Sequence, residues 1–189
     1  MSQELNTPKD SVRPILIVDD EEIVLVALRD TLLHEGYNVV SSPHAVHALS
    51  VLKEQEFSVV ITDQQMPMVS GLEFLAQVRQ IQPEATRILI TAVLNLSTLI
   101  DAINKAEIYR FVVKPWSREE LLASVKSAVE RFDYISNNSR LLSQTLAANR
   151  ELQQIHHTLE NQVARLALEN AQLRQPSGHP LQPGTKIGL

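Results

Sequence analysis

The stretch ILIVDDE at residues 15–21 joins four apolar residues to three acidic ones. Similar apolar runs recur along the chain, at residues 37–40 (YNVV), 57–62 (FSVVIT), 87–91 (RILIT) and 109–113 (YRFVV). Each run is short, β-branched and apolar at successive positions, which is typical of strands buried on both faces of a parallel sheet. The sequence therefore predicts five buried strands between residues 12 and 133.

Helix-start signals separate these runs. Ser42-Pro43 has the pattern of an N-cap followed by proline in the first helical turn. Ser70 with Glu73, and Ser117 with Glu120, have the spacing of capping boxes. Regular alternation of strands and helices predicts an α/β fold with a doubly wound, five-stranded parallel sheet.

Chemically active side chains follow the strands at their carboxyl ends, where open α/β sheets place their sites. Asp19 and Asp20 follow the first strand, and the others are Asp63, Thr91 and Lys114. Clustered carboxylates repel one another unless a hard cation joins them, and Mg²⁺ prefers oxygen ligands. A carboxylate beside Mg²⁺, a hydroxyl and an ammonium group can receive a phosphoryl group.

At these positions the sequence resembles the receiver domain of two-component response regulators. The matching segments are ILIVDDE (15–21), VVITDQQMPMVSG (59–71), LITA (89–92) and FVVKPW (111–116), in the family's order. The resemblance covers about residues 12–133 and implies a flavodoxin-like receiver fold. It also implies that Asp63 is the phosphoacceptor, and that a sensor histidine kinase or phosphotransfer protein is the donor.

The resemblance implies roles for the other residues as well. Mg²⁺ would be bound by Asp20 directly, by Asp19 through water, by Asp63 and by the backbone carbonyl of Gln65. Thr91 would hydrogen-bond the phosphoryl group, and Lys114 would form an ion pair with it. The peptide bond between Lys114 and Pro115 would be cis. Phe111 stands at the family's aromatic switch position, where it would act with Thr91. We expect no enzyme activity beyond slow autodephosphorylation.

A haloacid-dehalogenase-type phosphatase is the alternative, because that family also combines a nucleophilic Asp with Thr or Ser, Lys and Mg²⁺. Such an enzyme needs a second Asp two residues after the nucleophile as general acid. The residue at that position is Gln65, which cannot donate and recover a proton. A purely structural coiled-coil adaptor is a third interpretation, but it leaves the carboxylate cluster without a purpose.

Composition narrows the class of protein further. The 189 residues carry a net charge of −5 and no cysteine, and the five glycines form no phosphate-binding loop motif. These features argue against general nucleic-acid binding, disulfides and nucleotide loops. Neither a signal peptide nor a membrane-spanning stretch is evident, so we expect a cytoplasmic protein. We expect disorder in residues 1–11 and in the Pro- and Gly-containing tail, 176–189.

Residues 134–175 predict a coiled coil that continues the last helix. A heptad counted from Ile135 puts Asn149, His156 and Asn170 at a positions. The apolar residues that this register assigns to the dimer interface are Leu152, Leu159, Val163, Leu166 and Leu173. The pattern predicts a parallel homodimer that loosens when His156 is protonated. A helix that folds back onto the receiver, or that frays past Asn138, is the alternative.

The sequence does not specify what the receiver controls. The coil has no dense basic stretch, so direct nucleic-acid binding by this chain is not expected. Either the coil itself contacts a partner, or the receiver belongs to a longer protein. In the second case the output domain would be a cyclic-di-GMP enzyme or a transcriptional regulator.

Overall fold

The computed structural model describes residues 13–92 and 106–173. Two compact units make up the chain, and the boundary between them lies between Ser139 and Arg140. The expected disordered segments, 1–11 and 176–189, lie outside the described residues, as does most of the region between the fourth and fifth strands.

The first unit contains a parallel sheet of five strands in the order β2-β1-β3-β4-β5. The strands are β1 (Ile15–Val18), β2 (Val39–Ser42), β3 (Val59–Asp63), β4 (Thr86–Thr91) and β5 (Arg110–Val113). Every residue of β1, β3 and β4 is buried, as their apolar runs predict. The predicted doubly wound fold is confirmed.

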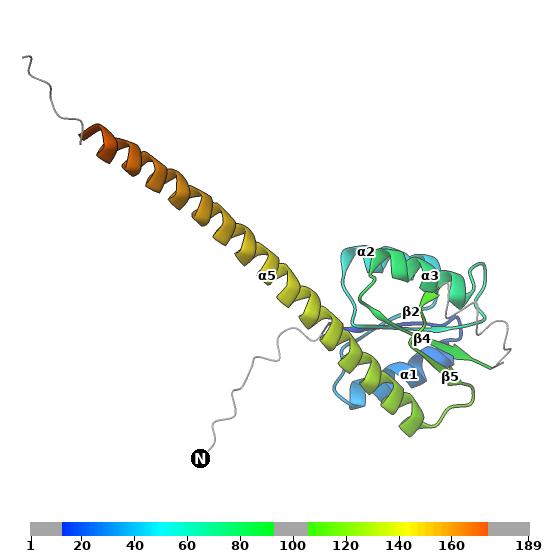
Figure 1. The fold of residues 1–189 in the computed structure, drawn as a ribbon. Coiled ribbons are helices and arrows are strands. Elements are labelled where there is room, and N and C mark those ends of the chain that lie inside the picture. The colour runs from blue at the N-terminus through cyan, green and yellow to red at the C-terminus, as the bar shows by residue number, and fades with distance from the viewer. Residues whose placement is uncertain (1–12, 93–105, 174–189) are drawn as a thin grey trace, which may run out of the picture. The chain divides into compact units, whose positions relative to one another are not determined.

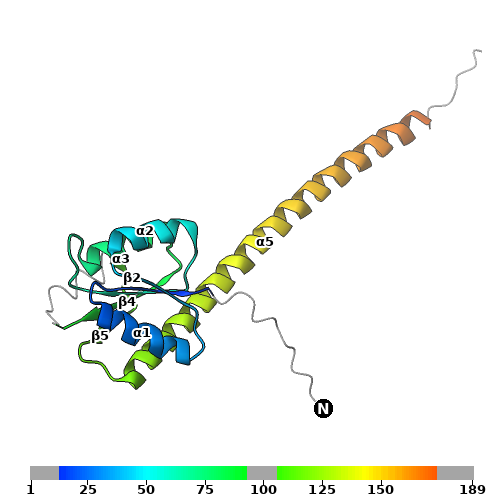
Figure 2. The same cartoon turned by 180° about the vertical axis from the view of Figure 1, so that it is seen from behind.

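Helices cover both faces of the sheet (Figures 1 and 2). They are α1 (Glu22–His34), α2 (Ala45–Glu54), α3 (Gly71–Ile81) and α5 (Arg118–Leu173). Alternate strand residues divide the core into two layers. Leu16, Val60 and Leu89 pack toward α2 and α3, whereas Ile17, Ile61 and Ile90 pack toward α1 and the first turns of α5.

The second strand and the second helix begin two or more residues later than the sequence predicts. β2 covers residues 39–42 instead of 37–40, and it pairs Ser41 and Ser42 with Ile17 and Val18. β2 tolerates these serines because most of this edge strand is only partly buried, and the hydroxyl of buried Ser42 donates to the His44 carbonyl oxygen at 3.0 Å. Ser42 is therefore the last strand residue and not the helix cap. α2 starts at Ala45, and its N-cap residue, His44, makes no side-chain capping bond.

The other helix-start signals agree better with the structure. Ser70 and Glu73 form a complete capping box at the start of α3. The hydroxyl of Ser117 accepts a hydrogen bond from the backbone N–H of Glu120 at 3.1 Å, which is the first half of the same arrangement. These bonds fix where α3 and α5 leave the loops that carry the polar residues.

A buried arginine holds the chain that leads into β5. The guanidinium of Arg87 donates to the backbone carbonyl oxygens of Ala106 and Ala85, both at 2.8 Å, and lies 3.5 Å from a carboxylate oxygen of Glu107. Arg87 is only 5% exposed. A buried charge needs such partners, so the network defines the entry to β5.

The described part of the second unit is a continuation of α5 as one uninterrupted helix through Leu173. Large apolar side chains along it are half or more exposed, among them Leu152, Leu159, Val163 and Leu166. The side chain of Leu173 lies outside the described residues. Within the part of the chain that the structure describes, no helix is both long and apolar enough to cross a lipid bilayer.

Candidate functional site

Four neighbouring strands bring the predicted polar residues to one edge of the sheet. Asp63 and Thr91 are the last residues of β3 and β4, and Asp19 and Lys114 directly follow β1 and β5. The strand order places β1, β3, β4 and β5 side by side. The residues Asp19, Asp63 and Thr91 are each at most 5% exposed.

Lys114 is the centre of this cluster. Its Nζ lies 2.6 Å from Oδ1 of Asp63, and 3.6 Å from both Oδ2 of Asp19 and Oε1 of Glu21. Its backbone N–H donates to the carbonyl oxygen of Thr91 at 2.8 Å, which ties the residue to the end of β4. One ammonium group therefore faces three carboxylates, as a bound cation would.

The loop after β3 holds the second oxygen of Asp63. The backbone N–H of Gln65 donates to Asp63 Oδ2 at 2.5 Å. The carbonyl oxygen of Gln64 accepts from the N–H of Gly71 at 3.0 Å, which closes the loop against α3. A Cβ atom at position 71 would collide with the Asp63 carbonyl oxygen. Glycine at this position allows the helix to approach the acidic residue.

Burial and charge act in opposite directions on the site's ionisation. Burial raises the pKa of Asp19 above its usual range, and this outweighs the opposing effects of the Glu21 N–H and of Lys114. Burial acts to lower the pKa of Lys114. The hydrogen bond with Asp63 and the nearby carboxylates of Asp19 and Glu21 prevail, so this pKa is raised. Asp19 is therefore a destabilised carboxylate, and Lys114 is firmly cationic.

The donor set fits a hard divalent cation in its chemistry. Asp19 Oδ2 is buried and accepts no hydrogen bond, with Lys114 at ion-pair distance only. A buried carboxylate oxygen of this kind calls for a cationic partner. In the described residues no three acidic or histidine side chains converge closely enough to hold a metal as they stand. Asp20 is exposed and borders an apolar hollow with Met66 and Pro67.

Most of the predicted site residues are thus gathered at one place. Phe111 lies half-buried on β5, paired in register with Leu89 and packed on the α2–α3 side of the core. The peptide bond between Lys114 and Pro115 is cis, as predicted. Sequence reasoning gave no site role to two contributors, Glu21 and Gly71. The run DDE and the glycine inside the predicted capping segment were the available signals.

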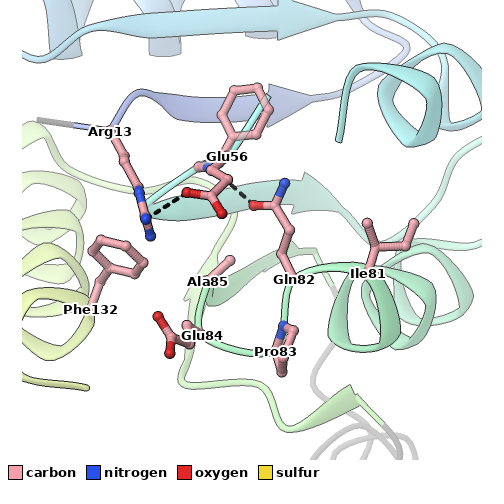
Figure 3. Close-up of a pocket in the computed structure, with 9 residues that line it drawn as sticks. Arg13, Glu56, Ile81, Gln82, Pro83, Glu84, Ala85 and Phe132 are labelled. Atoms are coloured by element: carbon pink, nitrogen blue, oxygen red, sulfur yellow. Dashed lines mark hydrogen bonds and ion pairs between the residues drawn. The ribbon is translucent and has the colours of Figure 1, made fainter. Parts of the chain in front are cut away.

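A second pocket lies at the opposite end of the sheet, where β1, β3 and β4 begin (Figure 3). Arg13 spans it, ion-paired to Glu56 at 2.5 Å and lying 5.2 Å from the ring centre of Phe132. The side-chain amide of Gln82 accepts from the backbone N–H of Phe57 at 2.9 Å. These contacts satisfy the polar groups between strand starts and α5, so we interpret this pocket as structural.

Comparison with known proteins agrees with this geometry. The model of the response regulator receiver domain matches residues 15–126, which is more than half of the chain. The chain belongs to the response regulator receiver domain family. Membership of this family favours the receiver over the phosphatase that the sequence left as an alternative. It also supports a role in two-component response regulation.

Two similar proteins are regulators much longer than this chain. The hydrogenase transcriptional regulatory protein HoxA of Cupriavidus necator is 39% identical over 121 residues, 64% of this chain and 25% of that protein. The alginate biosynthesis transcriptional regulatory protein AlgB of Pseudomonas putida is 34% identical over 65% of this chain and 27% of its own length. The chain spans about a quarter of the length of these relatives.

Among solved structures, similar receivers cover most of the first unit. A signal receiver domain of an HD domain-containing protein from Pseudomonas fluorescens Pf-5 has a TM-score of 0.65 and 35% identity, covering 70% of this chain and 98% of that one. The beryllofluoride-activated NtrC4 receiver domain dimer has a TM-score of 0.59 and 33% identity, covering 63% and 98%. The receiver fold is therefore shared at both the sequence and the structural level.

Proposed function

We propose that Asp63 accepts a phosphoryl group from a sensor histidine kinase or a phosphotransfer protein. A carboxylate oxygen of Asp63 attacks phosphorus in line with the bond to the donor's imidazole nitrogen. The N–P bond breaks as the O–P bond forms, and the electron pair stays on the imidazole. The product is an acyl phosphate on Asp63.

The placement of Lys114 is the observation that carries this proposal. An ammonium group 2.6 Å from the attacked carboxylate can follow the phosphoryl oxygens as negative charge accumulates on them. Asp19 and Glu21 both lie 3.6 Å from the same Nζ, so the lysine also contacts two carboxylates that follow β1. The Thr91 side chain, at the end of the adjacent strand, supplies a hydroxyl donor for the same oxygens.

Mg²⁺ is the cation that we assign to this site. Asp19, Asp20, Asp63 and the backbone carbonyl of Gln65 would hold it, and the unbonded Asp19 Oδ2 supports that set. When bound, the ion neutralises charge on the phosphoryl oxygens. The protein's own part is to hold Asp19 in a buried place beside Lys114 and to orient Asp63 through the Gln65 N–H. We propose that the chain has no enzyme activity other than slow autodephosphorylation.

Signal transmission would use the strands that end at the site. Phosphorylation would draw Thr91 inward and change the packing of Phe111 on the neighbouring strand, and β5 leads directly into α5. The fourth helix expected in this signalling face would lie between β4 and β5, where residues 93–105 are outside the described part of the chain. We further propose that α5 pairs with a second copy as a parallel coiled coil, in the cytoplasm and without direct nucleic-acid contact.

Phosphorylation with radiolabelled acetyl phosphate and Mg²⁺ tests the function. The full chain should retain label that is stable in acid and labile in base, and Asp63→Asn should retain none while staying folded. Asp63→Asn keeps the side-chain shape but lacks the nucleophilic oxygen. Label that persists in Asp63→Asn would place the acceptor elsewhere, and repeated turnover of phosphoesters would indicate a phosphatase.

The relatives favour one version of the downstream output. HoxA and AlgB are both named transcriptional regulatory proteins, so control of transcription is the output we propose first, with cyclic-di-GMP metabolism as the alternative. The reading frame that encodes this chain, read beyond residue 189, distinguishes a longer regulator from one whose coil is itself the output.

A further inference from the structure

The apolar face of α5 does not follow one heptad register along its length. Because residues 140–173 form one uninterrupted helix, the spacing of residues along the chain gives their angular position directly. Between residues 141 and 159, a 4-3-4-3-4 spacing connects Leu141, Thr145, Ala148, Leu152, Ile155 and Leu159. Leu141 and Ile155 are half exposed, like Leu152 and Leu159.

After Leu159 the apolar face continues in a heptad register different from that of residues 141–159. The next members are Val163, Leu166 and Asn170, at spacings of 4, 3 and 4. Two successive steps of four, from Ile155 to Leu159 and on to Val163, together with the step of three to Leu166, form an eleven-residue repeat in place of a seven-residue one. Such an insertion of four residues locally unwinds a coiled coil, at a period close to that of a straight helix.

We propose that α5 pairs in parallel with a second copy of this chain, with a change of register at Ile155-Leu159-Val163. This inference rests on the dimer proposed above and corrects its register. An unbroken heptad buries Asn149 and His156 where the shifted register buries Ala148 and Ile155. The shifted register therefore covers an exposed isoleucine and leaves two polar side chains at the edge of the interface.

Contacts along the helix agree with an edge position for His156. Its Nε2 lies 3.2 Å from Oε1 of Glu160, and both side chains are well exposed. The next residue, His157, lies 3.4 Å from the amide of Asn161. The His156–Glu160 pair lies on the flank beside Ile155, whereas the His157–Asn161 pair lies on the side of the helix turned away from it. Leu142 also flanks the shifted interface, and Leu146 and Leu168 lie farther from it.

Pairing of an acidic with a basic side chain between copies favours the same register and a parallel arrangement. In the shifted register Glu151 occupies a g position and His156 the following e position, so Glu151 of one copy faces His156 of the second. The unbroken heptad instead places Ile155 opposite Glu160 at these positions, and it forms no pair of an acidic and a basic side chain between residues 141 and 167. Beyond the change of register, Glu169 precedes Arg174 with the same spacing.

Single cysteines distinguish the two registers, and the absence of native cysteine leaves no background. Disulfide formation needs Cβ atoms about 4 Å apart, which only core positions of a parallel, in-register pair provide. Val163→Cys and Leu166→Cys are core positions in both registers, so they test the dimer. The register is tested by comparing the cross-linking of two pairs of variants: Ala148→Cys with Asn149→Cys, and Ile155→Cys with His156→Cys. All six variants are made in the full chain.

We expect efficient oxidative cross-linking at 163 and 166, and cross-linking at 148 and 155 about tenfold faster than at 149 and 156. Cross-linking at 149 and 156 that equals or exceeds that at 148 and 155 would overturn the change of register while leaving the dimer intact. Failure at 163 and 166, with a monomer in sedimentation, would overturn the dimer itself. A helix folded back on the receiver would give that second result.

Discussion

Gly71, the first residue of α3, lies so close to the backbone of Asp63 that no side chain fits between them. A Cβ at position 71 would fall 2.9 Å from the Asp63 carbonyl carbon and 3.0 Å from Cδ1 of Leu89, and closer still to the carbonyl oxygen. The close approach shapes the loop that presents Asp63 and that donates the Gln65 N–H to its carboxylate.

Substitution Gly71→Ala should therefore impair both stability and phosphorylation. Displacing backbone in a packed site costs about 1–3 kcal/mol of unfolding free energy, and the acetyl phosphate reaction should slow because Asp63 moves. Gly36→Ala is the matched control. Gly36 has φ +83° with open space around it, so that variant should lose about 1 kcal/mol through backbone strain and keep its phosphorylation rate. Equal phosphorylation rates in both variants would contradict the prediction.

Neutralising Asp19 should stabilise the metal-free protein. Because burial raises its folded-state pKa above the ordinary value of 3.8, the folded state prefers the protonated form. That preference contributes stability below about pH 4, and the contribution is lost as pH rises through the folded pKa. Asp19→Asn should gain about 1 kcal/mol at pH 7, and the gain should vanish below about pH 4. Urea unfolding across this range measures it, and a gain that grows toward low pH would refute the sign.

Magnesium should stabilise the native chain by mass action. Free Mg²⁺ at ten times its Kd would add about 1.4 kcal/mol, provided that the ion binds only the folded state. Asp20→Ala should abolish the gain. Asp30→Ala, on the exposed side of α1, is the control that should keep it. A melting temperature that does not change over a Mg²⁺ titration of the native chain would count against the metal site.

Mild acid should not loosen the coil. In the shifted register a protonated His156 faces Glu160 on its own helix and Glu151 of the second copy, so imidazolium is attracted and not repelled. We expect sedimentation to give a dimer at pH 6 at least as tight as at pH 7.5, with the difference removed in His156→Gln. A dimer that weakens at pH 6 only when His156 is present would support the unbroken heptad instead.

Beryllofluoride, a phosphoryl mimic, should change amide exchange near the end of β4 and around β5. Thr91 and Phe111 lie on these paired strands, and repacking either of them alters strand hydrogen bonding. Hydrogen exchange of residues 86–92 and 106–120 in the native chain measures the change, with Asp63→Asn as the control that should not respond. Identical exchange with and without the mimic would exclude this route of transmission.

The amino-acid sequence by itself determined the layers of the fold, the order of the site residues and the continuous last helix. Buried parallel strands must be apolar at successive positions, so the runs that lead to Asp19, Asp63 and Lys114 were recognisable without coordinates. The capping box at Ser70 was equally visible, because both of its hydrogen bonds are local in sequence. Local polar signals failed at Ser42, where pairing with β1 extended the strand through the expected cap.

Only the tertiary structure decided which charged groups of the site contact one another. That Lys114 contacts Asp63 more closely than Asp19, that Glu21 joins them, and that Gly71 must lack a side chain all depend on distances between segments remote in the chain. Asp20, adjacent to Asp19 in sequence, is exposed whereas Asp19 is buried, because successive residues after a strand point to different sides. Sequence spacing identifies which residues meet at a sheet edge, whereas packing sets which atoms touch.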